Sequence, residues 1–237
     1  MCKKEEMYSI ICDKNAILFI FYKTLIWTRN STNTSQRNGV LLRFFCSNNT
    51  RSRGVAILFN NDFEFKIKGI FRDNGGNFLM VHISTMKMDV LLVNIYGPNR
   101  DDPNLYTNLN KNIAKLKISN LILAGDWKLV LGPTIDYCNY KRTNNVKAQE
   151  KVEEIIADHC LVDIWRELSP QLQRFTWRRT NPFQQSRLDF FLISENLCNT
   201  VRDTDITPGY RTDHSMLTWV IIWGRLHKKI KTDILEI

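Results

Sequence analysis

Four short segments of the sequence place ionisable or polar side chains after or inside an apolar run, where enzymes built on sheets gather catalytic groups. These segments read NIYGPN, AGDW, SRLDFFLIS and GYRTDHS. In AGDW, Asp126 follows an apolar run that Gly125 ends, so its carboxylate could bind a metal ion or accept a proton from water. A lone aspartate in this position more often caps a turn or a helix, so Asp126 indicates a site only together with companions.

Asp189 lies inside the apolar segment RLDFFLI, where an unpaired carboxylate is costly to bury. We expect His214, in TDHS, to be its partner, because a carboxylate orients an imidazole and stabilises its charged form. Such a pair could donate a proton or stabilise negative charge, and the alternative is an ion pair that only supports the fold. Asp213 adds a second carboxylate to the same loop.

Tyr96 ends an apolar run and precedes the turn GPN, which would present the phenol and the Asn99 side chain outward, where both could contact phosphate. The alternative is that Tyr96 is an ordinary amphipathic residue at the rim of a sheet. Trp177 is flanked by Arg178 and, further along, by Arg187, a combination that suits backbone contacts and base stacking in a nucleic-acid site. The alternative for these arginines is plain surface charge.

The composition favours a polyanionic partner. Lysine and arginine number 33 against 24 aspartates and glutamates, which gives a net charge of +9, and the pI is about 9.3. This balance raises the expectation of nucleic-acid binding, although it is also compatible with an ordinary solvated surface. The six cysteines are scattered without a C-x-x-C pair, which indicates reduced thiols and neither a disulfide framework nor a zinc site.

These candidate residues need a sheet to position them, and short β-branched or aromatic runs from Arg53 onward predict one. Phe63, Phe65, Ile67 and Ile70 have the spacing of a strand with one face inward. The nearly continuous VLLVNIY predicts a central strand buried on both faces. The expected strands are GVAILF, FEFKIKGIF, NFLMVHIS, DVLLVNIY, NLILAGD, RFTW, RLDFFLIS and MLTWVII.

Two helices are predicted between these strands, at residues 103–117 and 145–160, and both should pack on a sheet. The first is entered through Asp101, Asp102 and Pro103, which places carboxylates near the positive helix end and proline where its missing donor costs little. The second has one apolar face, made by Val152, Ile155, Ile156 and Cys160.

The N-terminal region is less regular. The apolar stretch 15–27 is interrupted by Lys23 and falls short of the ~20 residues that a bilayer span needs, so we interpret it as a buried strand. We also expect no signal peptide, because Asp13 and Lys14 stand just before a very short apolar run. We expect a monomeric intracellular protein of the nucleus or cytoplasm, without membrane contact. Its expected parts are a degenerate N-terminal segment (1–50), the main domain (51–223) and a basic tail (224–237).

In this order, NIYGPN, GDW, FTWRR, SRLDFFLIS and PGYRTDHS resemble the endonuclease/exonuclease/phosphatase superfamily, in particular the endonucleases of LINE-type retrotransposons. The resemblance runs from about Asn48 to Ile222. It implies an α/β, DNase I-like fold: a two-sheet β-sandwich flanked by helices, here with an irregular N-terminal part. It also implies an endonuclease that uses Mg²⁺ or Mn²⁺ and acts on DNA, with RNA as an alternative partner.

The resemblance assigns roles to the candidate residues. It implies that Asp126 activates the attacking water and that His214, paired with Asp189, stabilises the charge that develops on the phosphate. It further implies that Asp213 supports the metal ion and that Tyr96 and Asn99 contact phosphate. Fixed donors and a cation that neutralise the reacting phosphate are what in-line attack on a phosphodiester needs.

Two positions depart from the family pattern, and both carry a positive charge. GDWK has Lys128 where the family has asparagine, and IFYKT has Lys23 where the family's metal-binding glutamate stands. We therefore expect the metal ion to bind weakly or not at all, and catalysis to be impaired. The alternatives are a non-catalytic nucleic-acid-binding remnant and a phosphoinositide or sphingolipid phosphodiesterase, the latter disfavoured by the arginines of FTWRR.

Overall fold

The computed structural model describes residues 7–12, 17–22, 40–47, 54–60, 63–85, 88–140, 145–209 and 212–221. Lys23 lies outside the described residues, as does the basic tail 224–237. The expectation that Lys23 replaces a metal-binding glutamate therefore stays a prediction.

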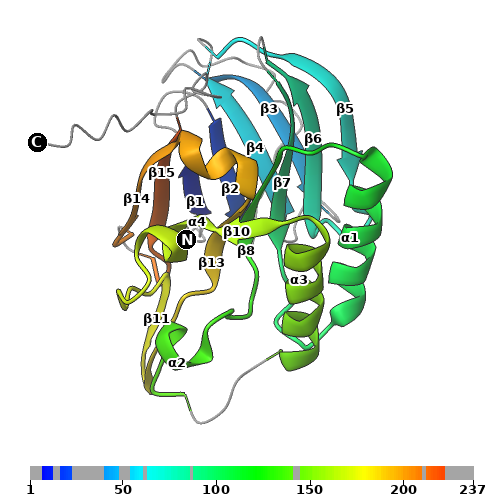
Figure 1. Cartoon of the computed structure of the whole chain (residues 1–237). Coiled ribbons are helices and arrows are strands. Elements are labelled where there is room, and N and C mark those ends of the chain that lie inside the picture. Colours follow the sequence, from blue (N-terminus) through cyan, green and yellow to red (C-terminus); the bar gives the residue numbers. More distant parts are fainter. Residues whose placement is uncertain are drawn as a thin grey trace, which may run out of the picture.

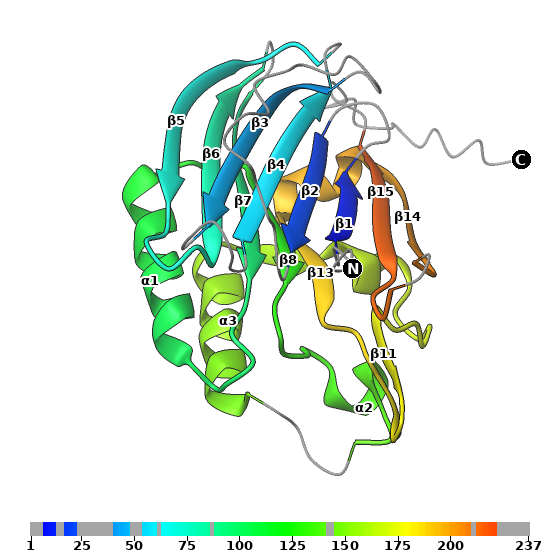
Figure 2. The ribbon, with the colours of Figure 1, turned by 180° about the vertical axis from the view of Figure 1, so that it is seen from behind.

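Two six-stranded sheets form the body of the chain, and Figures 1 and 2 show them from opposite sides. One hydrophobic cluster contains residues of both sheets, among them Ile57 of the first and Leu92 of the second, so the two sheets pack face to face. The first sheet has the order β14 (Val201–Thr207), β15 (Met216–Ile221), β1 (Met7–Cys12), β2 (Ile17–Tyr22), β4 (Gly54–Asn60), β3 (Val40–Ser47). The second has the order β10 (Leu161–Asp163), β13 (Asp189–Ser194), β8 (Leu121–Asp126), β7 (Asp89–Tyr96), β6 (Phe78–Ser84), β5 (Lys66–Arg72).

Strands from the first fifty residues are part of the first sheet. The strand expected within 15–27 is β2, which pairs with β1 on one side and with β4 on the other. β1 in turn runs parallel to β15, near the C-terminal end of the described chain. The irregular sequence of this region thus still supplies β1, β2 and β3 to the sandwich.

The centre of the second sheet is as expected. β7 is buried from Val90 to Tyr96 and lies between β6 and β8, which confirms VLLVNIY as a central strand. β8 runs parallel to β7 and antiparallel to β13, so Asp126 is paired in register with Tyr96 on one side and with Asp189 on the other. This register brings three of the candidate residues to one end of the sheet.

The prediction that one face of residues 63–70 is buried holds for the two phenylalanines and is wrong for the two isoleucines. Phe63 and Phe65 precede β5 and pack against the core, where the ring of Phe65 stacks on Phe59 at 4.3 Å. Ile67 and Ile70, in contrast, are 43% and 38% exposed. β5 is the edge strand of its sheet, and its register with β6 shifts between Ile67 and Gly69, so the alternation of the sequence does not continue through it.

Both predicted helices are present, as α1 (Pro103–Leu116) and α3 (Val146–Asp158). They lie side by side along the second sheet (Figure 1), and residues of both helices and of that sheet share a second hydrophobic cluster. Val152 and Ile155 face this cluster, but Cys160 lies beyond the end of α3 and is exposed. Asp101 does not cap α1, because its carboxylate accepts hydrogen bonds from the backbone N–H groups of Lys147 and Ala148 at the start of α3.

Three short strands form a third, small sheet that a β-bridge joins to His214. The expected strand at RFTW begins only at Trp177, as β11 (Trp177–Thr180), and forms a small sheet with β12 (Phe183–Ser186) and β9 (Tyr137–Cys138). The remaining elements are α2 (Pro133–Asp136), α4 (Ile164–Leu168) and a 3₁₀ helix at Glu195–Thr200. Among the described helices, none has the length and hydropathy to cross a bilayer.

Candidate active site

Asp126 and Asp189 come together because β8 and β13 are neighbours in the second sheet, where the two residues are register partners. Gly125 lets β8 approach β7 closely here: a Cβ atom on it would lie 2.0 Å from the carbonyl oxygen of Ile95. Both carboxylates are buried, with relative exposures of 0% and 1%. Buried carboxylates need charged or hydrogen-bonding partners.

The segment before β15 brings His214 to these carboxylates. A β-bridge joins His214 to Trp177, the N–H of Arg178 donates to the carbonyl of Asp213 at 2.9 Å, and the N–H of Ser215 donates to that of Thr176. The sequence offered no reason to single out Thr176, although it is fully buried. Its hydroxyl oxygen accepts from the backbone N–H groups of Leu188 and Asp189, both at 2.9 Å, so one residue ties the histidine segment to the start of β13.

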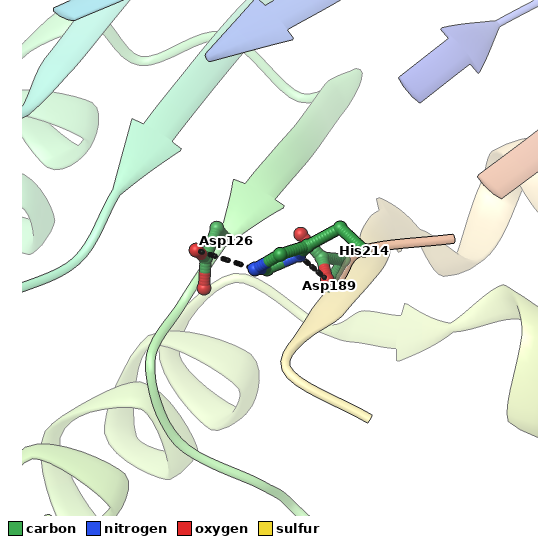
Figure 3. A group of neighbouring side chains, drawn as sticks. All are labelled: Asp126, Asp189 and His214. Atoms are coloured by element: carbon green, nitrogen blue, oxygen red, sulfur yellow. Dashed lines mark hydrogen bonds and ion pairs between the residues drawn. The ribbon is translucent and has the colours of Figure 1, made fainter. Parts of the chain in front are cut away.

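The three side chains form a row (Figure 3). His214 Nδ1 lies 2.8 Å from Asp189 Oδ2, and His214 Nε2 lies 3.8 Å from Asp126 Oδ2. Burial disfavours the charged imidazole, but Asp189 outweighs burial, with a further contribution from Asp126, so the pKa of His214 is raised. The expected pairing of His214 with Asp189 is therefore present, and the arrangement favours a protonated ring.

Lys128 belongs to the same cluster. Its ammonium contacts Asp126 Oδ2, and its backbone N–H donates to Asp126 Oδ1 at 3.2 Å. Burial acts against the ammonium, but the carboxylate of Asp126 more than compensates, so the pKa of Lys128 is raised. Burial in turn raises the pKa of Asp126, against the pull of the Lys128 ammonium. Lys128 thus forms an ion pair with the candidate general base.

The loop that carries Lys128 is held from several sides. Asn145 donates from Nδ2 to the carbonyl of Lys128 at 2.7 Å, and the Tyr106 hydroxyl donates to the carbonyl of Trp127. The indole of Trp127 is buried and donates to the carbonyl of Phe190 at 3.1 Å. Lys128 itself has φ 58°, a left-handed conformation that asparagine and glycine tolerate better than lysine.

A cavity of about 280 Å³ opens beside this cluster. Five of its lining residues were expected at the site from the sequence, namely Tyr96, Asn99, Trp177, Asp213 and His214, and Lys128 lines it as well. The rings of Tyr137 and Tyr140, which the sequence analysis missed, stack at 4.4 Å. The lining residues are Tyr96, Asn99, Lys128, Tyr137, Tyr140, Asn145, Trp177, Leu188, Asp213 and His214.

Asp213 lies at the cavity but outside the buried cluster. Its side chain is exposed and accepts a hydrogen bond from Trp177 Nε1 at 2.9 Å. Among the described residues, the acidic and histidine side chains whose ligand atoms gather closely are those of Asp126, Asp189 and His214, and Asp213 is not among them. The expected role of Asp213 in supporting a metal ion therefore stays a prediction.

Arg187 is not a surface residue, which corrects the expectation that it contacts a substrate. It is 1% exposed, and its guanidinium donates to Asp136 at 2.9 Å and to Asp163 at 2.6 Å. It therefore joins α2 and the start of α4 to the second sheet. Arg178 is half-buried and donates to the Ser215 hydroxyl at 3.0 Å, and neither arginine lines the cavity.

The cluster does not fit a divalent metal ion. Asp126, Asp189 and His214 each offer one ligand atom, and these atoms lie within 4.8 Å of one another. Mg²⁺ prefers carboxylate oxygens that keep their negative charge available. Here the Lys128 ammonium contacts Asp126, and His214 Nδ1 engages Asp189. A divalent ion would have to displace or face a buried positive charge.

Comparison with known proteins gives one curated relative and several solved structures. No protein-family model matches the chain. Over 174 residues the chain is 25% identical to the uncharacterized 149 kDa protein of transposon TX1 from Xenopus laevis, a match that covers 70% of this chain and 13% of the relative. The chain thus spans only a small part of that relative's length.

Three solved structures that superpose on this chain are nucleases. An AP endonuclease from Leishmania major superposes with a TM-score of 0.70 at 16% identity, covering 89% of this chain and 86% of that one. A 3′-5′ exonuclease from Neisseria meningitidis gives 0.67 at 18% identity, with 88% and 90% covered. The endonuclease domain of the non-LTR retrotransposon TRAS1 gives 0.59 at 17% identity, with 80% and 82% covered. These likenesses confirm the expected α/β, DNase I-like fold.

Proposed function

We propose that this chain is a DNA phosphodiesterase domain of the retrotransposon-endonuclease type whose catalysis is impaired. The observation that carries the proposal is the row Asp126, His214 and Asp189 beside a cavity with aromatic and amide side chains. The fold shared with nucleases, the similarity to a transposon protein and the net charge of +9 support DNA as the substrate.

The chemistry follows from the positions of the side chains. A phosphate group in the cavity would meet the imidazole of His214, and Asp189 holds this ring in place and favours its positive charge. A positive, pre-oriented donor stabilises the negative charge that builds up during attack on phosphorus. Asp126 is the group that would accept a proton from the attacking water.

Lys128 explains why turnover should be low. A carboxylate that forms an ion pair with an ammonium is a weaker proton acceptor, because protonation would break the pair. The same ammonium opposes Mg²⁺ or Mn²⁺, so we propose that these ions bind weakly and that no step depends on a bound metal ion. The pairing of Lys128 with Asp126 also favours a second candidate, a domain that binds DNA without cutting it.

Nicking of supercoiled plasmid separates the two candidates. We would compare the wild-type chain with Asp126→Asn and with the matched surface variant Glu154→Gln, in Mg²⁺, in Mn²⁺ and in EDTA. Slow nicking that Asp126→Asn abolishes and Glu154→Gln preserves supports the phosphodiesterase. Salt-sensitive DNA binding without nicking supports the second candidate. A chain that neither nicks nor binds DNA overturns both.

A further inference from the structure

We propose that the Lys128 ammonium takes the electrostatic place of a divalent metal ion, so that the cavity binds a phosphate diester without metal. This inference rests on the proposed function, since it concerns the phosphodiester of the same site. It goes beyond impaired catalysis, because it gives the substituted lysine a role of its own. The ligand is a singly charged phosphate group flanked by nucleosides.

The ammonium has the position that this role requires. Its partner is Asp126, yet the Lys128 side chain is not closed off: it is 14% exposed and lines the cavity together with His214. An ammonium carries three N–H donors, so contact with Asp126 leaves donors for a ligand. The Tyr96 ring lies beneath it, with Nζ 5.1 Å from the ring centroid, and limits where the ammonium can move.

Hydrogen bonds to neighbouring residues hold the backbone of Lys128. Lysine is disfavoured at φ 58°, and the conformation persists because neighbouring groups hold the loop. Asn145 Nδ2 donates to the Lys128 carbonyl at 2.7 Å, and the Lys128 N–H donates to Asp126 Oδ1. Asn145, which directly precedes α3, thus helps to hold the loop that carries Lys128.

The balance of charges favours an anion over a cation. Both buried carboxylates already have a nitrogen partner, since the Lys128 ammonium contacts Asp126 and His214 Nδ1 lies 2.8 Å from Asp189 Oδ2. A divalent cation needs carboxylate oxygens as ligands. A phosphate in the cavity would instead meet the Lys128 ammonium, and lysine is a common point-charge ligand for phosphate.

The first test measures binding of thymidylyl-thymidine, a single phosphodiester, by shifts of amide resonances in the NMR spectrum of the whole chain. We expect the same affinity, within about twofold, in EDTA and in Mg²⁺, and a loss of about tenfold or more in Lys128→Met, since each tenfold is ~1.4 kcal/mol. Lys128→Arg, which keeps the charge, should stay within about threefold of wild type. Lys111→Met, on the exposed face of α1, is the matched control.

The second test measures Mn²⁺ binding by electron paramagnetic resonance. Wild type should bind Mn²⁺ weakly, and Lys128→Asn should bind it about tenfold more tightly, because the opposing charge is gone. Dinucleotide binding that requires metal, or an unchanged affinity in Lys128→Met, would overturn the inference. If Lys128→Met does not fold, the affinity of the wild-type chain for the dinucleotide in EDTA and in Mg²⁺ still tests whether binding requires metal. Failure here leaves Asp126-dependent plasmid nicking untouched, so it is distinguishable from failure of the proposed function.

Discussion

His214 Nδ1 lies 2.8 Å from Asp189 Oδ2, and both side chains are buried. This contact orients the ring so that Nε2 faces Asp126, 3.8 Å from its Oδ2. A fixed imidazole between two carboxylates is more readily protonated than one in water, as the raised pKa of His214 reflects. The predictions below start from this contact and extend to the charges around it.

Replacing Asp189 by asparagine keeps the shape of the side chain and removes its charge. We expect the pKa of His214 to fall, because Asp189 is the main group that raises it. Plasmid nicking should fall by about 100-fold, a typical contribution of a positioned acid or base. NMR titration of the imidazole protons checks the pKa independently of activity. Asp203→Asn, on an exposed part of β14, should change neither quantity.

The stability of the chain should depend on pH through His214. Its pKa is raised in the folded state, so its contribution is fully present below the unfolded value of about 6.5 and is lost as pH rises through the folded value. Urea unfolding of wild type and His214→Gln between pH 5 and pH 9 checks this. The wild-type free energy of unfolding, relative to the variant, should decrease as pH rises. A difference that stays constant or increases contradicts the prediction.

Lys128→Asn should increase nicking in the presence of Mn²⁺. The exchange frees Asp126 from its ion pair and introduces a residue that accepts φ 58° more easily. We expect an increase of about tenfold, equivalent to ~1.4 kcal/mol, with stability within about 1 kcal/mol of wild type because relief of strain offsets the lost ion pair. Lys128→Ala is the control for strain: it also removes the charge but gains no tolerance of this backbone conformation. Equal or lower nicking by Lys128→Asn contradicts the assigned effect of the ammonium.

Arg187→Met should unfold the chain more easily without acting on the substrate site. The exchange removes the guanidinium that pairs with Asp163. Asp136 also loses this guanidinium and keeps only its ion pair with Arg166. Breaking a buried ion pair on one side costs about 3–5 kcal/mol. Arg179→Met, at an exposed position of β11, should change stability by less than about 0.5 kcal/mol. Urea unfolding measures both, and similar values for the two variants would contradict the structural role of Arg187.

Much of the fold was predictable from local sequence. Alternating and continuous apolar runs predicted the strands around Asp126, and helical spacing predicted α1 and α3 to within a few residues. These patterns report which side of an element is buried, and each is contained in a short stretch of chain. The pairing of Asp189 with His214 was also accessible, because a carboxylate inside an apolar strand requires a partner.

Local patterns could not predict what depends on contacts between distant segments. The sequence predicted Arg187 as a substrate contact because its partners, Asp136 and Asp163, come from other elements. Ile67 and Ile70 read as buried because nothing in their spacing reveals that β5 is an edge strand.

The sequence by itself determined which residues are available for chemistry: acids, an imidazole and a lysine at the ends of apolar runs. Only the tertiary structure decided that the ammonium of Lys128 contacts Asp126 and not solvent. The physical reason is that charge pairing depends on distance in space and on burial. Both are set by strand register and by the hydrogen bonds that hold the loop after β8.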